Sequence, residues 1–160
     1  MSSEADETLE HFIYRAEGPV LVSACLLGLK TRYDGSDSRN AELAELAANA
    51  RLVPVCPEQL GGLPTPRVKS SLTGGDGEDV LSGDARVVNE AERVVTENFL
   101  RGARQTLDVA RMFGAKFAVL KEKSPSCGVL RTYVDWELLE GCGVATAALK
   151  MRGTEIFVLP

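Results

Sequence analysis

Three short apolar runs, each leading into a cysteine, constrain this chain of 160 residues more than any other feature. The runs end at Cys25, at Cys56 and, after a short polar loop, at Cys127. Runs of this length and composition predict buried β-strands. Because the carboxyl ends of parallel strands share the edge of a sheet where ligands bind, we expect the three thiols to lie close together. Three converging thiolates predict a metal centre.

Strand-like and helix-like segments alternate along most of the chain. Strands are predicted at residues 20–24, 52–55, 116–120 and 154–159, and helices at residues 39–50, 96–113 and 143–152. This alternation predicts the α/β class, with one Rossmann-like domain over residues 19–160 that has a parallel sheet and helices on both faces. Right-handed crossovers favour the strand order 2-1-3-4, in which Cys25 and Cys127 follow neighbouring strands.

Three segments depart from this alternation. Residues 1–18 begin with a polar, acidic run and predict a loosely attached N-terminal extension. Residues 59–95 are rich in glycine and proline and form a long irregular insertion after the second strand. Such an insertion predicts a binding loop or lid, or alternatively a disordered surface loop. Residues 129–140 have no clear period, and we expect Trp136 and Leu138 to anchor them in the core.

Composition and charge exclude several classes of function. The net charge of -5 argues against binding of polymeric nucleic acid, because proteins of that class present basic surfaces. No apolar run is long enough to span a membrane, and residues 1–10 do not resemble a signal peptide, so we expect a cytoplasmic protein. Thiols stay reduced in that compartment, which favours metal binding or catalysis over disulfide formation.

Histidine is nearly absent, and this excludes further kinds of site. The single histidine, His11, lies in the polar N-terminal segment, so Ser-His-Asp triads and histidine-based zinc sites are excluded. The four cysteines form no C-x-x-C pair, which excludes a thioredoxin-type redox motif. The C-x5-R loop of low-molecular-weight phosphatases is not supported either. The sixth position after Cys25 is Thr31, and Arg32 comes one residue too late.

Three cysteines leave two kinds of metal centre open. A [4Fe-4S] cluster normally takes four cysteines, so three ligands leave one iron open to act as a Lewis acid on a substrate. A structural zinc ion would need a fourth ligand, and Cys142 is the only remaining thiol. Burial as a small apolar residue is the commonest fate of a free cysteine, and we expect it for Cys142. An open iron predicts an enzyme, whereas four protein ligands predict a structural or electron-carrying module.

Several separated motifs resemble the family known as DUF523, which includes the thiouracil desulfurases. The resemblance extends over roughly residues 20–158, and the stretches that carry it are Ser23–Gly28, Arg32–Gly35, Cys56–Arg67 and Lys121–Gly128. The resemblance implies an oxygen-sensitive [4Fe-4S] cluster with three cysteine ligands, Cys25, Cys56 and Cys127, and one open iron. It also implies a small-molecule thiolated pyrimidine and the iron–sulfur assembly machinery as partners.

The same resemblance implies roles for other polar residues of the motifs. Glu58 of the C-P-E triplet and Ser124 of the S-P-S-C run would be the acid–base residues, although Ser124 equally fits a simple Ser-Pro turn. A carboxylate beside the cluster can move protons between ring nitrogen, water and leaving sulfide. Further candidates for contact with the substrate are Arg67, Lys121, Lys123, Ser126 and Asp34. The three basic residues among them would meet a ring oxygen or a nucleotide phosphate.

The expected reaction is a non-redox desulfuration of a thiolated uracil. The candidate substrates are 2-thiouracil, 4-thiouracil and 4-thio-UMP, with sulfide and uracil or UMP as products. A soft thiocarbonyl sulfur suits an open iron of a cluster, and its coordination would make the ring carbon open to attack by water. The alternative is a structural metal-binding or iron–sulfur carrier module that turns over no thiouracil.

Overall fold

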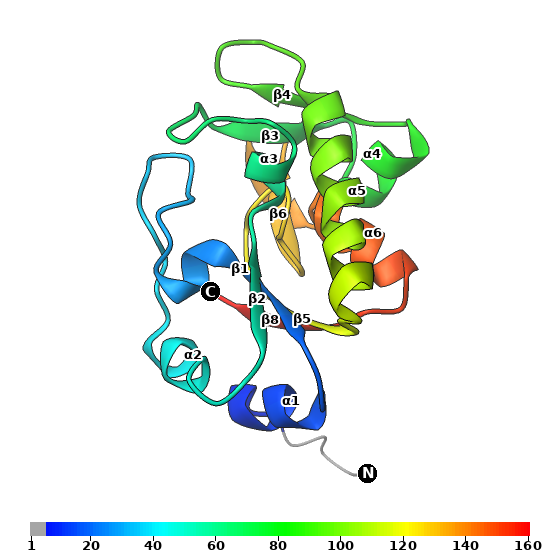
Figure 1. The fold of residues 1–160 in the computed structure, drawn as a ribbon. Coiled ribbons are helices and arrows are strands. Elements are labelled where there is room, and N and C mark those ends of the chain that lie inside the picture. Colours follow the sequence, from blue (N-terminus) through cyan, green and yellow to red (C-terminus); the bar gives the residue numbers. More distant parts are fainter. Residues whose placement is uncertain (1–5) are drawn as a thin grey trace.

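A four-stranded parallel sheet forms the centre of the computed structural model, which describes residues 6–160 (Figure 1). Its strands are β1 (Val20–Ser23), β2 (Leu52–Val55), β5 (Phe117–Lys121) and β8 (Glu155–Leu159). They lie in the order β2-β1-β5-β8, and each neighbouring pair is parallel. This is the predicted order 2-1-3-4, so the α/β class and the strand order are confirmed.

Helices cover both faces of this sheet, as predicted. They are α1 (Leu9–Arg15) and α2 (Ala41–Leu46) on one face, and α5 (Thr96–Phe113) and α6 (Val144–Met151) on the other. Successive side chains of a strand point to opposite faces. Val20 and Val22 therefore pack with α1 and α2, whereas Leu21 packs with α5 and α6. All three side chains are fully buried, which explains why the strand reads as a continuous apolar run.

The expectation of a loosely attached N-terminal extension is wrong for residues 9–15. Helix α1 joins the core of the sheet, because Leu9, Phe12 and Ile13 are buried against it. The ring of Phe12 meets that of Phe117 edge to face, with centroids 5.2 Å apart. Residues 1–5 of the predicted extension lie outside the described part of the chain.

A second sheet is formed by residues 59–95, predicted as an irregular insertion, and by residues 129–140, for which the sequence shows no clear period. It consists of β3 (Ser70–Thr73), β4 (Arg86–Asn89), β6 (Arg131–Val134) and β7 (Glu137–Glu140), in the order β4-β3-β6-β7. Two short helices, α3 (Pro57–Leu60) and α4 (Gly77–Ser82), lie in the same region. The alternative of a disordered surface loop for residues 59–95 is therefore wrong. Leu72, Val87 and Val134 of this sheet pack against residues of α4, α5 and α6.

The hairpin of β6 and β7 does not anchor Trp136 in the core. Asp135 and Trp136 form its two-residue turn, with φ angles of 49° and 67°, the left-handed conformation that a tight hairpin turn requires. The Trp136 side chain is 45% exposed as a result, so that expectation is wrong. Among residues 6–160, no helix combines the length and the apolar character needed to cross a bilayer.

Candidate metal centre and substrate pocket

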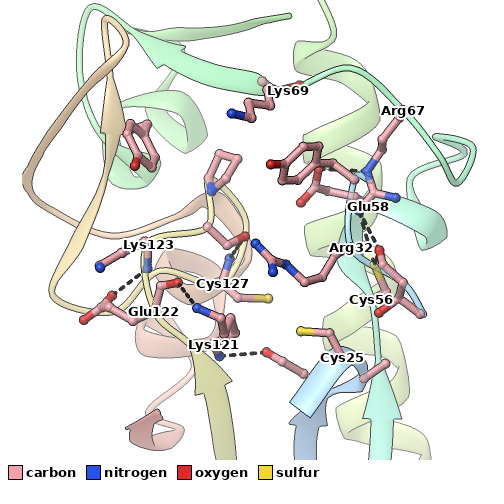
Figure 2. A pocket seen from close by; sticks show the side chains of 18 of the residues that line it. Cys25, Arg32, Cys56, Glu58, Arg67, Lys69, Lys121, Glu122, Lys123 and Cys127 are labelled. Carbon is pink, nitrogen blue, oxygen red and sulfur yellow. Dashed lines mark hydrogen bonds and ion pairs between the residues drawn. The ribbon is translucent and has the colours of Figure 1, made fainter. Parts of the chain in front are cut away.

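A cavity of about 410 Å³ opens at the carboxyl edge of the parallel sheet (Figure 2). The three predicted cysteines, Cys25, Cys56 and Cys127, all line it, because each follows the carboxyl end of a strand, β1, β2 or β5. Residues of the second sheet and its flanking loops complete the opposite wall. The two sheets thus enclose one pocket, with all three thiols on the side of the first sheet.

Local backbone structure sets the direction of two of these cysteines. Cys25 lies in a 3-10 turn, η1 (Ala24–Leu27), and its carbonyl accepts the N–H of Ser38 at 3.0 Å. Gly28 ends this turn with φ 93°, a conformation that glycine adopts at little cost. Cys56 is the residue before the first turn of α3, and its thiol lies 3.8 Å from the carbonyl oxygen of Thr31.

The loop that carries Cys127 is tied together by two side chains. The Ser124 Oγ accepts the backbone N–H groups of Ser126 and Cys127, each at 3.1 Å. The Glu122 carboxylate accepts backbone N–H groups from four residues on both sides of the loop: Lys123, Val129, Leu130 and Arg131. Both contacts fix the backbone around Cys127.

The same loop docks on the N-terminus of α6. The first N–H groups of a helix lack partners within it, and carbonyls of the loop satisfy two of them. Val144 N donates to Pro125 O at 2.9 Å, and Thr146 N donates to Ser126 O at 3.1 Å. The approach requires a glycine at Gly143, since a Cβ there would lie 2.4 Å from the Ser126 carbonyl carbon.

Burial raises the pKa of all three thiols in the pocket. In Cys25 the nearby Lys121 ammonium opposes the effect of burial, and in Cys127 a hydrogen bond with the Ser23 side chain does so. The neighbouring Cys56 also raises the pKa of both Cys25 and Cys127, and Cys25 raises that of Cys127. Burial therefore disfavours the thiolate form of these cysteines. Coordination to a metal deprotonates a thiol outright, so a cationic centre would stabilise the three thiolates in this pocket.

The donor set fits a cluster better than a single ion. Within residues 6–160, no group of three or more His, Cys, Asp or Glu side chains converges tightly enough to hold one metal ion. A zinc ion requires four ligands around one point, whereas a cluster binds each cysteine at a different iron. Cys142, the fourth ligand that a zinc site would need, is not among the residues lining the pocket.

Cys142 is buried elsewhere, as expected. It is 3% exposed, and its backbone N–H donates to Asp76 Oδ2 at 3.3 Å. Burial, followed by the neighbouring Asp76 carboxylate, raises the pKa of its thiol to about 11.

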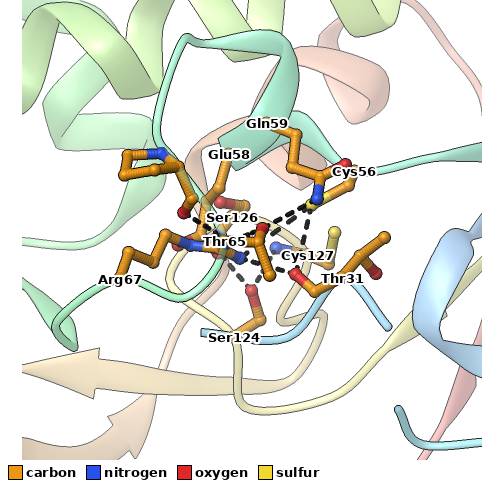
Figure 3. A network of polar contacts seen from close by, with 10 residues as sticks. Thr31, Cys56, Glu58, Gln59, Thr65, Arg67, Ser124, Ser126 and Cys127 are labelled. Carbon is orange, nitrogen blue, oxygen red and sulfur yellow. Dashed lines mark hydrogen bonds and ion pairs between the residues drawn. The ribbon is translucent and has the colours of Figure 1, made fainter. Parts of the chain in front are cut away.

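The two residues implied as acid–base groups line the pocket together with the cysteines. Glu58 lies in the first turn of α3, and its Oε1 accepts a hydrogen bond from Arg67 Nε at 3.2 Å. Arg67 also lines the pocket, but its side chain is only 6% exposed, and its guanidinium bonds to protein groups on several sides (Figure 3). Ser124 is the residue whose hydroxyl ties the Cys127 loop.

The other candidates for substrate contact divide into two groups. Lys121 and Lys123 line the pocket, and partial burial followed by the nearby Arg32 lowers the pKa of Lys121. Asp34 is exposed and accepts hydrogen bonds from Ser36. Ser126 is buried within the loop that carries Cys127, and neither residue lines the pocket.

The pocket contains further polar and aromatic residues that sequence reasoning did not assign to the site. Lys69 Nζ and the Arg32 guanidinium lie 5.2 and 5.8 Å from the ring centroid of Tyr33, so two cations flank one aromatic ring. Arg32 and Tyr33 belong to the stretch Arg32–Gly35 that resembles the family, so the sequence did contain a signal for these two residues. Tyr133 and Trp136 come from the unanticipated second sheet, and no local pattern marked them or Lys69.

Comparisons with known proteins agree with this site. The family model described as 2-thiouracil desulfurase matches residues 20–159. An uncharacterized protein of Bacillus subtilis (strain 168), YbbK, is 39% identical over 140 residues, which cover 86% of this chain and 93% of that protein. The solved structure of the [4Fe-4S]-dependent thiouracil desulfidase TudS (DUF523Vcz) superposes with a TM-score of 0.75 and 39% identity. That match covers 88% of this chain and 90% of TudS.

The matched region includes both sheets and all the residues that line the pocket. A match over so much of the chain, to a model and to a solved structure alike, confirms the resemblance inferred from the cysteine motifs. The chain belongs to the 2-thiouracil desulfurase family, also known as DUF523.

Proposed function

We propose that this protein is a [4Fe-4S]-dependent enzyme that hydrolyses the thiocarbonyl of a thiolated uracil and releases sulfide. The observation that carries the proposal is that three cysteines, a carboxylate and a hydroxyl line one pocket: Cys25, Cys56, Cys127, Glu58 and Ser124. The similarity to a desulfidase that depends on such a cluster supports it. The three cysteines would hold the cluster, delivered by the iron–sulfur assembly machinery, and leave one iron open. A bound cluster would supply a Lewis acid for the soft sulfur of the substrate.

Glu58 is the proposed general acid–base group. Its Oε1 is held by Arg67, whereas no residue in the described part of the chain bonds to Oε2. Oε2 is therefore available to take a proton from water and to return it to the ring nitrogen or the leaving sulfide. Water oxygen replaces sulfur at the ring carbon, so the products are sulfide and the corresponding carbonyl compound, with no net redox change.

Ser124 is the proposed donor that orients the water or the substrate ring. Its Oγ accepts two backbone N–H groups, so the hydroxyl hydrogen remains available to donate into the pocket. The turn-forming role and the catalytic role are thus compatible, because the turn fixes the position of the hydroxyl.

The charges of the pocket favour a substrate with an anionic substituent, such as 4-thio-UMP, over a free base. Arg32, Lys69 and Lys123 line the pocket, and none of them forms an ion pair with a described residue. Figure 2 shows Lys69 on the side of the pocket away from Cys25. A phosphate there would extend away from the thiols while the pyrimidine points toward them.

The decisive experiment is an anaerobic assay of the purified protein with 2-thiouracil, 4-thiouracil and 4-thio-UMP. We expect a brown protein with about four irons per chain, the stoichiometry of one cluster. Sulfide release should accompany loss of the near-ultraviolet absorbance of the thiocarbonyl. A brown protein that releases no sulfide from any of the three would favour the carrier alternative. A colourless protein with one zinc ion per chain would favour a structural metal site.

A further inference from the structure

We infer that Arg67 is a positioning residue that holds the Glu58 carboxylate and the Cys56 sulfur in place, and that it does not bind substrate. The inference rests on the proposed function and assigns a role to a residue whose chemistry would otherwise suit a phosphate ligand.

Every donor of the Arg67 guanidinium already has an acceptor within the protein (Figure 3). Arginine carries five N–H groups in a rigid planar fork. The structure gives them five acceptors, at 3.2, 3.3, 2.8, 2.9 and 4.0 Å: Glu58 Oε1, Pro64 O, Thr65 Oγ1, Thr31 O and Cys56 Sγ. A phosphate could bind this group only by displacing one of these acceptors.

These contacts join three separate segments of the chain. Thr31 belongs to the loop after β1, Cys56 and Glu58 to the junction of β2 and α3, and Pro64 and Thr65 to the loop that follows α3. The backbone of Arg67 adds a fourth tie, because its N–H donates to Tyr33 O at 2.7 Å. Arg67 thus holds the wall of the pocket that carries both a proposed ligand and the proposed acid–base group.

Burial makes this arrangement rigid. The Arg67 side chain is 6% exposed and that of Glu58 is 15% exposed. A buried guanidinium is tolerated only when its donors are satisfied, so rotation of this side chain away from Glu58 would leave charges unpaired in the interior. Because Nε contacts Oε1 alone, the bond directs the carboxylate without occupying Oε2.

The contact with Cys56 gives Arg67 a second effect. Nη2 lies 4.0 Å from Cys56 Sγ, within reach of a long N–H···S hydrogen bond. Hydrogen bonds to the ligand sulfurs tune the reduction potential of an iron–sulfur cluster. A positive donor at this sulfur stabilises the reduced state, so its removal should shift the potential to more negative values.

The test begins with Arg67→Lys and Arg67→Met, with Arg104→Lys on the exposed side of α5 as the matched control. Lysine keeps the charge but lacks the fork that reaches Glu58 and Cys56 together. We expect Arg67→Lys to lower kcat about 100-fold, the cost of misplacing a reacting group by about 1 Å, with KM changed less than about twofold. Unchanged kcat, or a raised KM for 4-thio-UMP alone, would overturn the inference in favour of a phosphate ligand.

A double-mutant cycle with Glu58→Gln separates positioning from a general structural role. If Arg67 acts through Glu58, Arg67→Lys should cost little further rate in the Glu58→Gln background. Additive losses would show that Arg67 acts independently of Glu58 and would overturn that half of the inference.

The reduction potential of the bound cluster provides a readout that does not depend on turnover. Arg67→Met should shift it to more negative values, and Arg104→Lys should leave it unchanged. An unshifted potential in Arg67→Met would overturn the inferred effect of Arg67 on the Cys56 sulfur. If the wild-type protein releases no sulfide, the proposed function fails, but the potential still tests this contact. If Arg67→Met does not fold, Arg67→Gln, which also removes the positive charge, carries the same measurement.

Discussion

The carboxylate of Glu122 accepts the backbone N–H of Val129 at 2.7 Å and thereby closes the loop that carries Cys127. Partial burial opposes ionisation of Glu122, but the backbone N–H groups that it accepts outweigh burial and lower its pKa. A lowered pKa means that the ionised carboxylate stabilises the folded state. That contribution is fully present above the pKa of the unfolded chain and is lost as the pH falls through the lower pKa of the folded chain.

We therefore expect Glu122→Gln to lower the free energy of unfolding near neutral pH by about 1.5–3 kcal/mol, the range for hydrogen bonds to a charged group. The difference from the wild type should narrow as the pH falls into the acidic range where Glu122 itself becomes protonated. Urea titrations at several pH values measure both effects. A difference that stays constant down to strongly acidic pH would contradict the assignment.

The cysteines should differ sharply in their effect on iron content. Serine at Cys25, Cys56 or Cys127 removes a thiolate from the pocket, so each variant should lose the cluster and its brown colour. Cys142→Ser should keep about four irons per chain, because Cys142 lies beside Asp76 outside the pocket. Iron analysis and visible absorbance after anaerobic purification test this. Loss of iron from Cys142→Ser would reopen the four-ligand alternative.

Glu58→Gln should separate cluster binding from catalysis. The amide keeps the shape of the side chain but cannot move a proton, so we expect intact cluster absorbance and a rate lower by about 10²–10⁴-fold. Glu97→Gln, on the exposed surface of α5, is the matched control and should keep the wild-type rate. Full sulfide release by Glu58→Gln would remove Glu58 from the mechanism.

Gly143→Ala should disturb the metal centre from outside the pocket. The added Cβ would press on the Ser126 carbonyl carbon, and overpacking of this kind typically costs about 1–3 kcal/mol. Because the displaced loop carries Cys127, iron content should fall together with the melting temperature. Gly18→Ala, where the nearest atom to a new Cβ is 3.8 Å away, should change neither. Wild-type iron content in Gly143→Ala would show that the loop is not held by α6.

Lys69→Met tests the preference for an anionic substituent. Loss of a charged contact to phosphate should raise KM for 4-thio-UMP about tenfold or more, since hydrogen bonds to charged groups are worth about 1.5–3 kcal/mol. KM for free 4-thiouracil, which lacks the phosphate, should remain at the wild-type value. Steady-state kinetics with both substrates make the comparison. An equal rise for both would place Lys69 against the pyrimidine instead.

Local sequence patterns determined the parallel sheet and the cysteine set. The four central strands are apolar runs bounded by turn or helix signals, and each is recognisable without knowledge of its partners. Right-handed crossovers then leave few strand orders, so the meeting of Cys25, Cys56 and Cys127 at one edge follows from the order of segments along the chain. Glu58 and Ser124 came with the same motifs because they lie within a few residues of those cysteines.

Only the tertiary structure decided the second sheet and the wall that it contributes. Its strands are four residues long, and β3 pairs with β6 through Leu72 and Val134, which are far apart in the chain. Pairing over such a separation is stabilised by burial against α4, α5 and α6, and no local period encodes it. The direction of Arg67 has the same origin. A guanidinium in a loop can face solvent, a ligand or the protein, and the acceptors that three folded segments bring around it determine which.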